Sequence, residues 1–67
     1  MTADQIVEAA FNIITYAGNA RGIAMEAIET AKEGNFKEAR QQIQEARDEM
    51  NNSHNYQTEL ITSEANG

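Results

Sequence analysis

The feature that most constrains the fold is the segment Glu-Gly-Asn-Phe at positions 33–36, which separates two helical patterns of similar length. Gly34 can adopt the left-handed backbone conformation that ends a helix, and Lys32 is placed to interact with the negative end of the helix dipole. Asn35 is a good N-cap for a second helix, and Glu38 lies three positions later, as a capping box requires. The segment therefore predicts a helix end followed at once by a helix start.

Because this connection is so short, the two helices must lie antiparallel and in contact. We expect an all-α fold, an antiparallel helical hairpin that forms a single domain over residues 1–67. Thr2 and Gln5 form a capping box that begins the first helix. The second helix is expected over residues 36–65, and the pair Asn-Gly at 66–67 indicates its end.

Two neighbouring apolar seams run along the first helix at alternating spacings of three and four residues. One seam is rich in alanine and allows close approach of another helix, and the other is bulkier. A stripe this wide exceeds what one partner helix can cover, so the first helix is expected to have at least two neighbours, of which the hairpin supplies one. The alanine-rich seam comprises Ile6, Ala10, Ile13, Ala17, Ala20, Ala24, Ala27 and Ala31. The bulky seam comprises Val7, Phe11, Ile14, Gly18, Arg21, Met25 and Ile28.

The second helix has one seam, which becomes polar in its second half. A polar layer formed by Ser53, His54 and Gln57 interrupts positions where a bundle usually has Leu or Ile. Such a layer either fixes register and partner number or belongs to a site. The seam comprises Phe36, Ala39, Ile43, Ala46, Met50, Ser53, Gln57 and Leu60.

Arg21 is unusual because it lies in the bulky seam with no carboxylate three or four residues away. Its guanidinium either reaches solvent or contacts a carboxylate or carbonyl of another helix, or an anion at a subunit junction. Lys37, Arg40 and Arg47, by contrast, alternate with carboxylates and indicate a solvated face.

Composition narrows the possible function classes. The net charge is −6, which argues against nucleic acid or anionic lipid as a partner. There is no cysteine, so disulfides and thiolate metal sites are excluded. No leader pattern and no long apolar run is present, and we expect a cytoplasmic protein without a membrane span.

His54 is the only histidine and the only obvious acid–base side chain for chemistry at neutral pH. Its neighbours three and four residues away include no carboxylate, so its own helix supplies neither an orienting partner nor a second metal ligand. Its seam position predicts a core histidine shielded from a protein donor, with phosphoacceptor or metal-site roles as alternatives. We therefore expect no catalytic residue, cofactor site or metal site in this chain.

Several stretches together resemble the helical enzyme IIA proteins of the lactose/cellobiose (chitobiose) type in the bacterial sugar phosphotransferase system. The closing run is similar to the family pattern AH-x-x-Q-T-x-L-I-x-x-E-A-x-G, with Ser53 in place of the usual alanine. The similar stretches are Tyr-Ala-Gly-Asn-Ala-Arg at 16–21, Glu-Ala at 26–27, Ala-Lys-Glu-Gly-Asn-Phe at 31–36, Ala39, Ser-His-Asn-Tyr-Gln-Thr-Glu-Leu-Ile at 53–61 and Glu-Ala-Asn-Gly at 64–67.

The resemblance implies a cytoplasmic phosphocarrier with three helices per subunit, a spectrin-like bundle assembled as a trimer. Such a protein takes a phosphoryl group from the small phosphocarrier protein and passes it to the IIB component. In the family the phosphorylated histidine opens a third-helix motif, H-x-Q-D-H, whose aspartate holds a divalent metal at the trimer axis. His54 matches the second-helix histidine, and the catalytic role is not transferred to it.

We therefore expect the first two helices of such an enzyme IIA, truncated before the phosphoacceptor helix and present as a homo-oligomer. The alternative is a stand-alone helical hairpin that serves self-association or protein binding, with no role in phosphotransfer.

Overall fold

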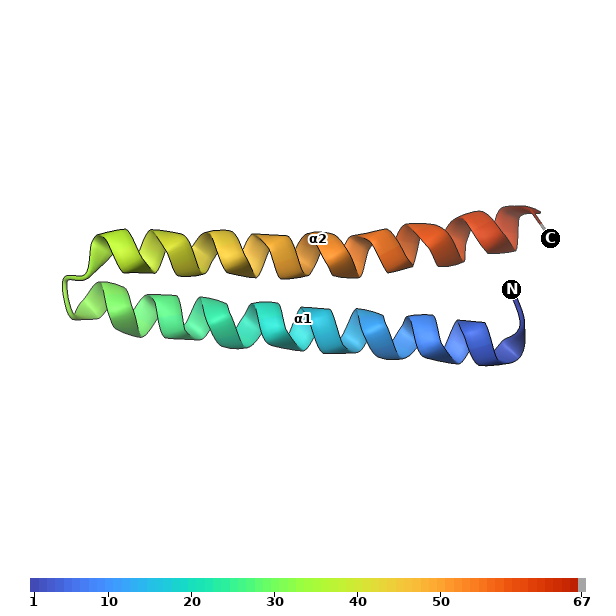
Figure 1. Ribbon diagram of the computed structural model, residues 1–67, viewed down its shortest axis with the longest axis horizontal. Helices are drawn as coiled ribbons and strands as arrows, with labels where there is room; N and C mark the ends of the chain where they lie inside the picture. The colour runs from blue at the N-terminus through green and yellow to red at the C-terminus, as the bar shows by residue number, and fades with distance from the viewer. Residues whose placement is uncertain (67) are drawn as a thin grey trace.

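The computed structural model is a hairpin of two long helices, and it describes residues 1–66 and the side chains of residues 1–63. Helix α1 spans Ala3–Lys32 and helix α2 spans Phe36–Asn66. They lie side by side and antiparallel, so that both termini lie at one end and the turn at the other (Figure 1). The all-α hairpin prediction is confirmed. The end predicted at Asn66 agrees with α2, whereas Gly67 lies outside the described residues.

The capping box predicted at the start of α1 is present. The Gln5 amide donates a hydrogen bond to Oγ1 of Thr2 over 3.2 Å, and the Thr2 amide donates to Oε1 of Gln5 over 2.8 Å. Two of the amide groups that lack a partner at a helix start are thereby satisfied. Asp4 adds a negative charge in the first turn, where it interacts favourably with the helix dipole.

Gly34 ends α1 in the left-handed backbone conformation that the sequence predicts. Gly34 has a φ of 87°, the only glycine with positive φ among the described residues. Its amide donates to the Ala31 carbonyl over 3.0 Å, and the Asn35 amide donates to the Thr30 carbonyl over 3.2 Å. This pair of bonds is a Schellman motif, which satisfies carbonyls that the helix leaves open.

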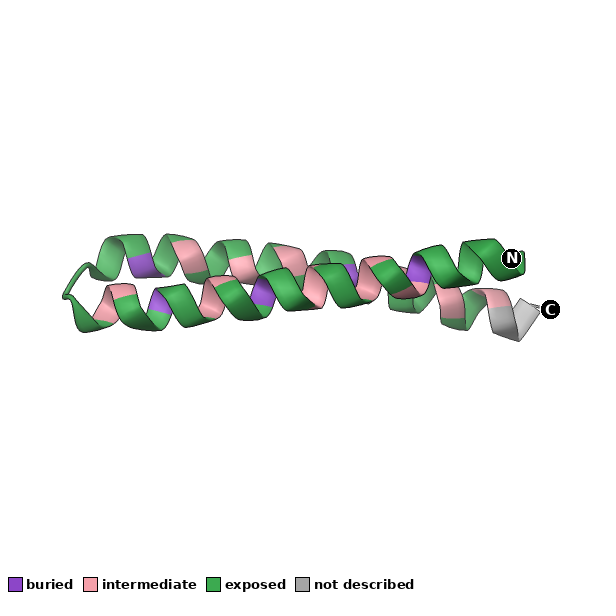
Figure 2. Ribbon diagram, turned by 90° about the horizontal axis from the view of Figure 1, so that it is seen from below, coloured by how far each residue is buried: buried purple, intermediate pink, exposed green. Residues whose placement is uncertain are grey.

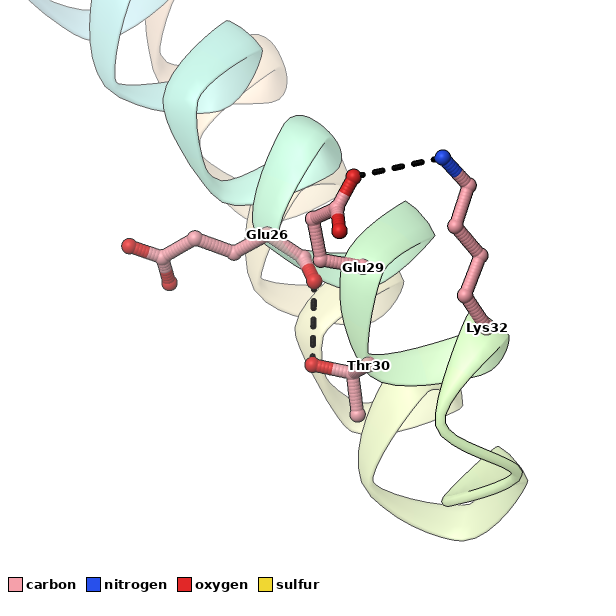
Figure 3. Close-up of polar contacts among 4 residues, drawn as sticks. All are labelled: Glu26, Glu29, Thr30 and Lys32. Atoms are coloured by element: carbon pink, nitrogen blue, oxygen red, sulfur yellow. Dashed lines mark hydrogen bonds and ion pairs between the residues drawn. The ribbon is translucent and has the colours of Figure 1, made fainter.

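The last turns of α1 carry two further polar contacts (Figure 3). Lys32 Nζ lies 3.4 Å from Oε1 of Glu29, with both side chains largely exposed. The Thr30 hydroxyl donates to the Glu26 carbonyl over 2.9 Å. An exposed pair of this kind contributes little to stability, so the lysine acts mainly through the helix dipole.

The second capping box, predicted between Asn35 and Glu38, is not formed in the part of the chain that the structure describes. The α2 ladder begins with the Ala39 amide donating to the Asn35 carbonyl over 3.0 Å. A capping box requires Glu38 to accept from the Asn35 amide, but that amide is already donated to the carbonyl of Thr30. The end of α1 and the start of α2 compete for one donor, and the end of α1 takes it.

The alanine-rich seam of α1 faces α2, with two differences from the predicted seam: Ala9, which was not part of it, is buried, and Ile6, which was, is exposed. Ala9, Ala20 and Ala27 of α1 and Ala39 of α2 are buried, and Ser53 is completely buried. Figure 2 shows the buried positions recurring along both helices, with most of the remaining surface exposed. Small side chains let the two backbones approach closely and lose little rotamer freedom on packing.

The seam predicted for α2 is right at alternate positions and wrong at the others. Ala39, Ala46, Ser53 and Leu60 face α1, whereas Phe36, Ile43, Met50 and Gln57 are exposed. Gln42, Glu49 and Tyr56, each one residue before an expected position, are half-buried instead, and so is Ser63, beyond the predicted seam. Helix α2 is thus rotated about its axis relative to the predicted seam, which leaves Ile43 and Met50 at the margin of the contact.

Candidate functional site

The largest uncovered feature is an apolar stripe on the outer side of α1, the bulky seam of the sequence. It comprises Val7, Phe11, Ile14, Met25 and Ile28, and Ile14 and Phe11 are 71% and 68% exposed. The prediction that the hairpin covers only one of the two α1 seams is confirmed. We call this surface the α1 outer stripe.

The amount of exposed surface supports the same point. The chain exposes 5070 Å², whereas a compact monomer of its mass exposes about 4,200 Å². The excess of roughly 900 Å² is similar to the surface that one partner buries in an ordinary protein interface, about 800 Å². The elongated hairpin therefore exposes more surface than a compact monomer of its mass.

A second uncovered feature is a groove of about 270 Å³ between the middles of the two helices. Arg21 and Arg47 are among its lining residues, but the surface exposed in the groove is almost entirely apolar. We call it the arginine groove. Its lining comprises Ala20, Arg21, Ala24, Ile43, Ala46, Arg47 and Met50.

A pair of tyrosines joins the two helices. The rings of Tyr16 and Tyr56 stack across the two helices with centroids 5.8 Å apart and planes inclined by 16°. Asn52, Asn55 and Glu59 line the hollow beside them. This stack fixes one helix against the other, as offset aromatic pairs do.

The structure separates the residues predicted to form the polar layer. Ser53 is buried, and its hydroxyl donates to the Ile13 carbonyl over 3.1 Å. His54 and Gln57 are exposed on the hairpin, so the prediction that they are core side chains in the helix contact is wrong. They follow the outward side of α2 together with Met50, because the inward side continues from Ser53 to Tyr56.

Arg21 is exposed at the edge of the arginine groove, and none of the ion pairs found among the described residues includes it. Arg47 was expected on a solvated face but borders the same groove. Its position could have been recognised from the sequence, because Ile43 and Met50 lie four residues before and three residues after it.

Two polar atoms in the helix contact lack a hydrogen-bond partner among the described residues, Oε1 of Gln42 and Oε2 of Glu49. The sequence analysis missed both residues because it followed the larger apolar side chains of α2. Burying such atoms without a partner lowers stability.

The described residues bring together no three side chains of the His, Cys, Asp or Glu type that could hold a metal ion. Neither described helix combines the length and apolar character needed to cross a bilayer.

Comparison with known proteins identifies the family. Residues 8–67 match the family model described as PTS system, Lactose/Cellobiose specific IIA subunit. The chain is 47% identical over 64 residues to the lichenan-specific phosphotransferase enzyme IIA component of Bacillus subtilis, covering 96% of this chain and 58% of that protein. It is 36% identical over 66 residues to the lactose-specific EIIA component of Lacticaseibacillus casei, covering 98% of this chain and 59% of that protein.

A third relative is the N,N'-diacetylchitobiose-specific EIIA component of Escherichia coli K12, 33% identical over 63 residues, with 94% of this chain and 54% of that protein covered. The chain thus spans less than two thirds of the length of these relatives. No solved structure matches the hairpin. Because the family model covers nearly the whole sequence, the chain belongs to the lactose/cellobiose-specific IIA subunit family of the phosphotransferase system.

Proposed function

We propose that this hairpin is the scaffold part of a cytoplasmic phosphocarrier that serves uptake of a sugar of the lactose or cellobiose type. The observation that carries the proposal is the family match over residues 8–67, which covers both helices. In this role the protein takes a phosphoryl group from the small phosphocarrier protein and passes it to the IIB component. The two helices hold the acceptor in place and do not react themselves.

The phosphoryl acceptor in this proposal is a histidine outside these 67 residues, in a segment with the family's H-x-Q-D-H motif. His54 is exposed, so the expectation that folding shields its imidazole is wrong. Exposure alone does not make an acceptor, because phosphoryl transfer needs an oriented imidazole and donors around the phosphoryl oxygens. Within α2, the residues one turn from His54 are Met50, Asn51, Gln57 and Thr58, which provide neither a carboxylate nor a cation.

We further propose that the hairpin works as a homo-oligomer, a trimer by resemblance, in which the α1 outer stripe is covered. The excess exposed surface supports association. The divalent metal at the trimer axis belongs to the same proposal. In this proposal its ligand is the aspartate of the H-x-Q-D-H motif.

The test is phosphoryl transfer in vitro. The 67-residue chain, incubated with phosphoenolpyruvate and the general phosphotransfer proteins, is expected to gain no acid-labile phosphate. The same chain joined to a helix with the H-x-Q-D-H motif is expected to gain one phosphoryl group per subunit. In that longer protein His54→Gln retains transfer, whereas replacing the motif's first histidine abolishes it.

Acid-labile phosphate on His54 of the 67-residue chain would overturn the assignment of the acceptor. A joined protein that folds and associates but accepts no phosphate would favour the other role, a hairpin that serves only self-association or protein binding.

A further inference from the structure

We propose that two copies of the hairpin pair antiparallel along the α1 outer stripe, with Gly18 of one copy against Gly22 of the other. Every apolar side chain of the stripe is more than half exposed, while α2 packs on the alanine-rich seam instead. Exposed apolar side chains in such a row are typical of a contact with another protein. The order of the residues along the stripe indicates which partner fits it and in which direction.

Two glycines lie at the middle of the stripe, and packing within the hairpin does not explain them. A Cβ added at Gly18 or at Gly22 would meet no atom within 4 Å, so neither glycine serves the approach of α2. Each lowers helix stability by about 1 kcal/mol relative to alanine. Both are exposed and they lie one turn apart, so they form a shallow depression, which we call the glycine notch. A second helix can come close to the α1 backbone there.

The stripe is complementary to itself when the second copy lies antiparallel. Large side chains flank the glycine notch on both sides, Phe11 and Ile14 before it and Met25 and Ile28 after it. Both helices rise by about 1.5 Å per residue, so meeting at the notch places Ile14 level with Met25 of the second copy. Phe11 is likewise level with Ile28. A two-fold axis makes each of these contacts twice, as in dimers that use the same patch on both subunits.

The charges along the stripe favour this direction over a parallel one. Asp4 and Glu8 lie at its start, whereas Arg21 and Lys32 lie in its second half. A parallel pair would place Arg21 against Arg21, and like charges that face each other oppose association. An antiparallel pair brings Lys32 to the level of Glu8 of the second copy. It also places Arg21 over the glycine notch of that copy, where no side chain occupies the space.

The pairing concerns the 67-residue hairpin and does not rest on a role in phosphoryl transfer. An antiparallel pair has two-fold symmetry, so it is not a part of a three-fold assembly. The trimer proposed above therefore belongs to a protein that contains the H-x-Q-D-H segment, whereas the hairpin by itself forms the antiparallel pair.

Disulfide formation between two single-cysteine variants tests the direction, because the chain has no cysteine of its own. Glu8→Cys and Lys32→Cys are mixed in equal amounts in a glutathione redox buffer, and mass spectrometry measures the mixed and the symmetric disulfides. We expect at least about tenfold more of the mixed disulfide than of either symmetric one, because pairing raises the effective concentration of the two thiols. Glu8→Cys mixed with Thr15→Cys is the matched control. Both positions are exposed on α1 but lie at different levels of the pair, so a random ratio is expected.

Sedimentation equilibrium gives a second measurement. Lys32→Glu should weaken dimer formation about fivefold, because it places like charges together twice in each pair. The swap Glu8→Lys/Lys32→Glu should restore dimer formation. Lys37→Glu makes the same charge change at an exposed position of α2, and it should have no such effect.

Symmetric disulfides as the main products would overturn the proposal, and a mass of three chains would then indicate that the hairpin alone forms the trimer. A random ratio of disulfides for Glu8→Cys with Lys32→Cys, or a chain that stays monomeric at every concentration, would overturn it as well. So would a charge swap that fails to restore association. The phosphoryl-transfer assay has no bearing on this pairing, so the two proposals fail separately.

Discussion

Gly34 shows how much of the turn depends on one backbone conformation. A Cβ added at this glycine would meet no atom within 4 Å, so the space around it does not restrict its replacement. The restriction is the φ of 87°, which β-branched residues strongly resist.

Gly34→Val is therefore expected to lower the free energy of unfolding by about 1–2 kcal/mol. Gly34→Asn should cost less, because asparagine tolerates the left-handed region. Thermal unfolding followed by circular dichroism measures both. Equal melting temperatures for the parent and the valine variant would mean that the left-handed turn is not needed.

Ser53 is the residue at which the two helices meet most tightly. Ser53→Ala removes the hydrogen bond to the Ile13 carbonyl, and we expect a loss of about 0.5–1.5 kcal/mol. Ser53→Leu inserts a large side chain where the side chain is fully buried, and it should cost about 1–3 kcal/mol. Asn52→Ala, at the exposed neighbouring position, is the control. Urea denaturation measures the free energy of unfolding of each variant. A Ser53→Leu variant as stable as the Asn52→Ala control would contradict a tight contact at Ser53.

At the scale of the helices, α1 is predicted from the sequence more completely than α2. The two α1 seams differ in side-chain size, so close packing selects the alanine seam and leaves the bulky one outside. In α2 the spacing of three or four after Ala39 allows either Gln42 or Ile43 to face inward. Hydrophobicity favours Ile43, but in the structure Gln42 is half-buried and Ile43 is exposed.

The residues of the candidate site are predicted less well than the fold, because the sequence does not show which residues of α2 face α1. His54 and Gln57 were placed inward because the seam was followed through Ile43 and Met50. Arg21 was recognised because it interrupts an apolar seam, whereas Arg47 was hidden among charged neighbours. Its place at the groove depends on how α2 is rotated against α1, and tertiary packing decides that rotation.

The rotation of α2 also buries an oxygen of Glu49 that has no hydrogen-bond partner among the described residues. Glu49→Met keeps a long side chain and removes this unpaired atom, so we expect the free energy of unfolding to rise by about 1 kcal/mol. Glu45→Met, at an exposed position one turn earlier, should change stability by less than about 0.5 kcal/mol. Denaturant unfolding of the two variants side by side checks this, and a loss of stability in Glu49→Met would mean that the carboxylate has a partner in solution.

For the whole molecule, the decisive property is the uncovered apolar surface. A 67-residue chain has a core near the lower limit for independent folding, and this hairpin places several of its large apolar α1 side chains outside that core.

Phe11→Gln/Ile14→Gln should weaken association by at least about tenfold, because both side chains are among the most exposed of the α1 outer stripe. Glu8→Gln/Thr15→Gln, at exposed polar positions of α1, is the control for sedimentation velocity. Equal association of the two double variants would exclude the stripe as the interface.

We propose above all that the hairpin is a subunit and not a complete folded monomer. Sedimentation equilibrium and circular dichroism over a dilution series of the parent chain test it most directly. We expect masses above that of one 7.4 kDa chain at high concentration, and helicity that falls as dilution dissociates the subunits. A 7.4 kDa species that stays helical and unfolds cooperatively at every concentration would contradict the claim.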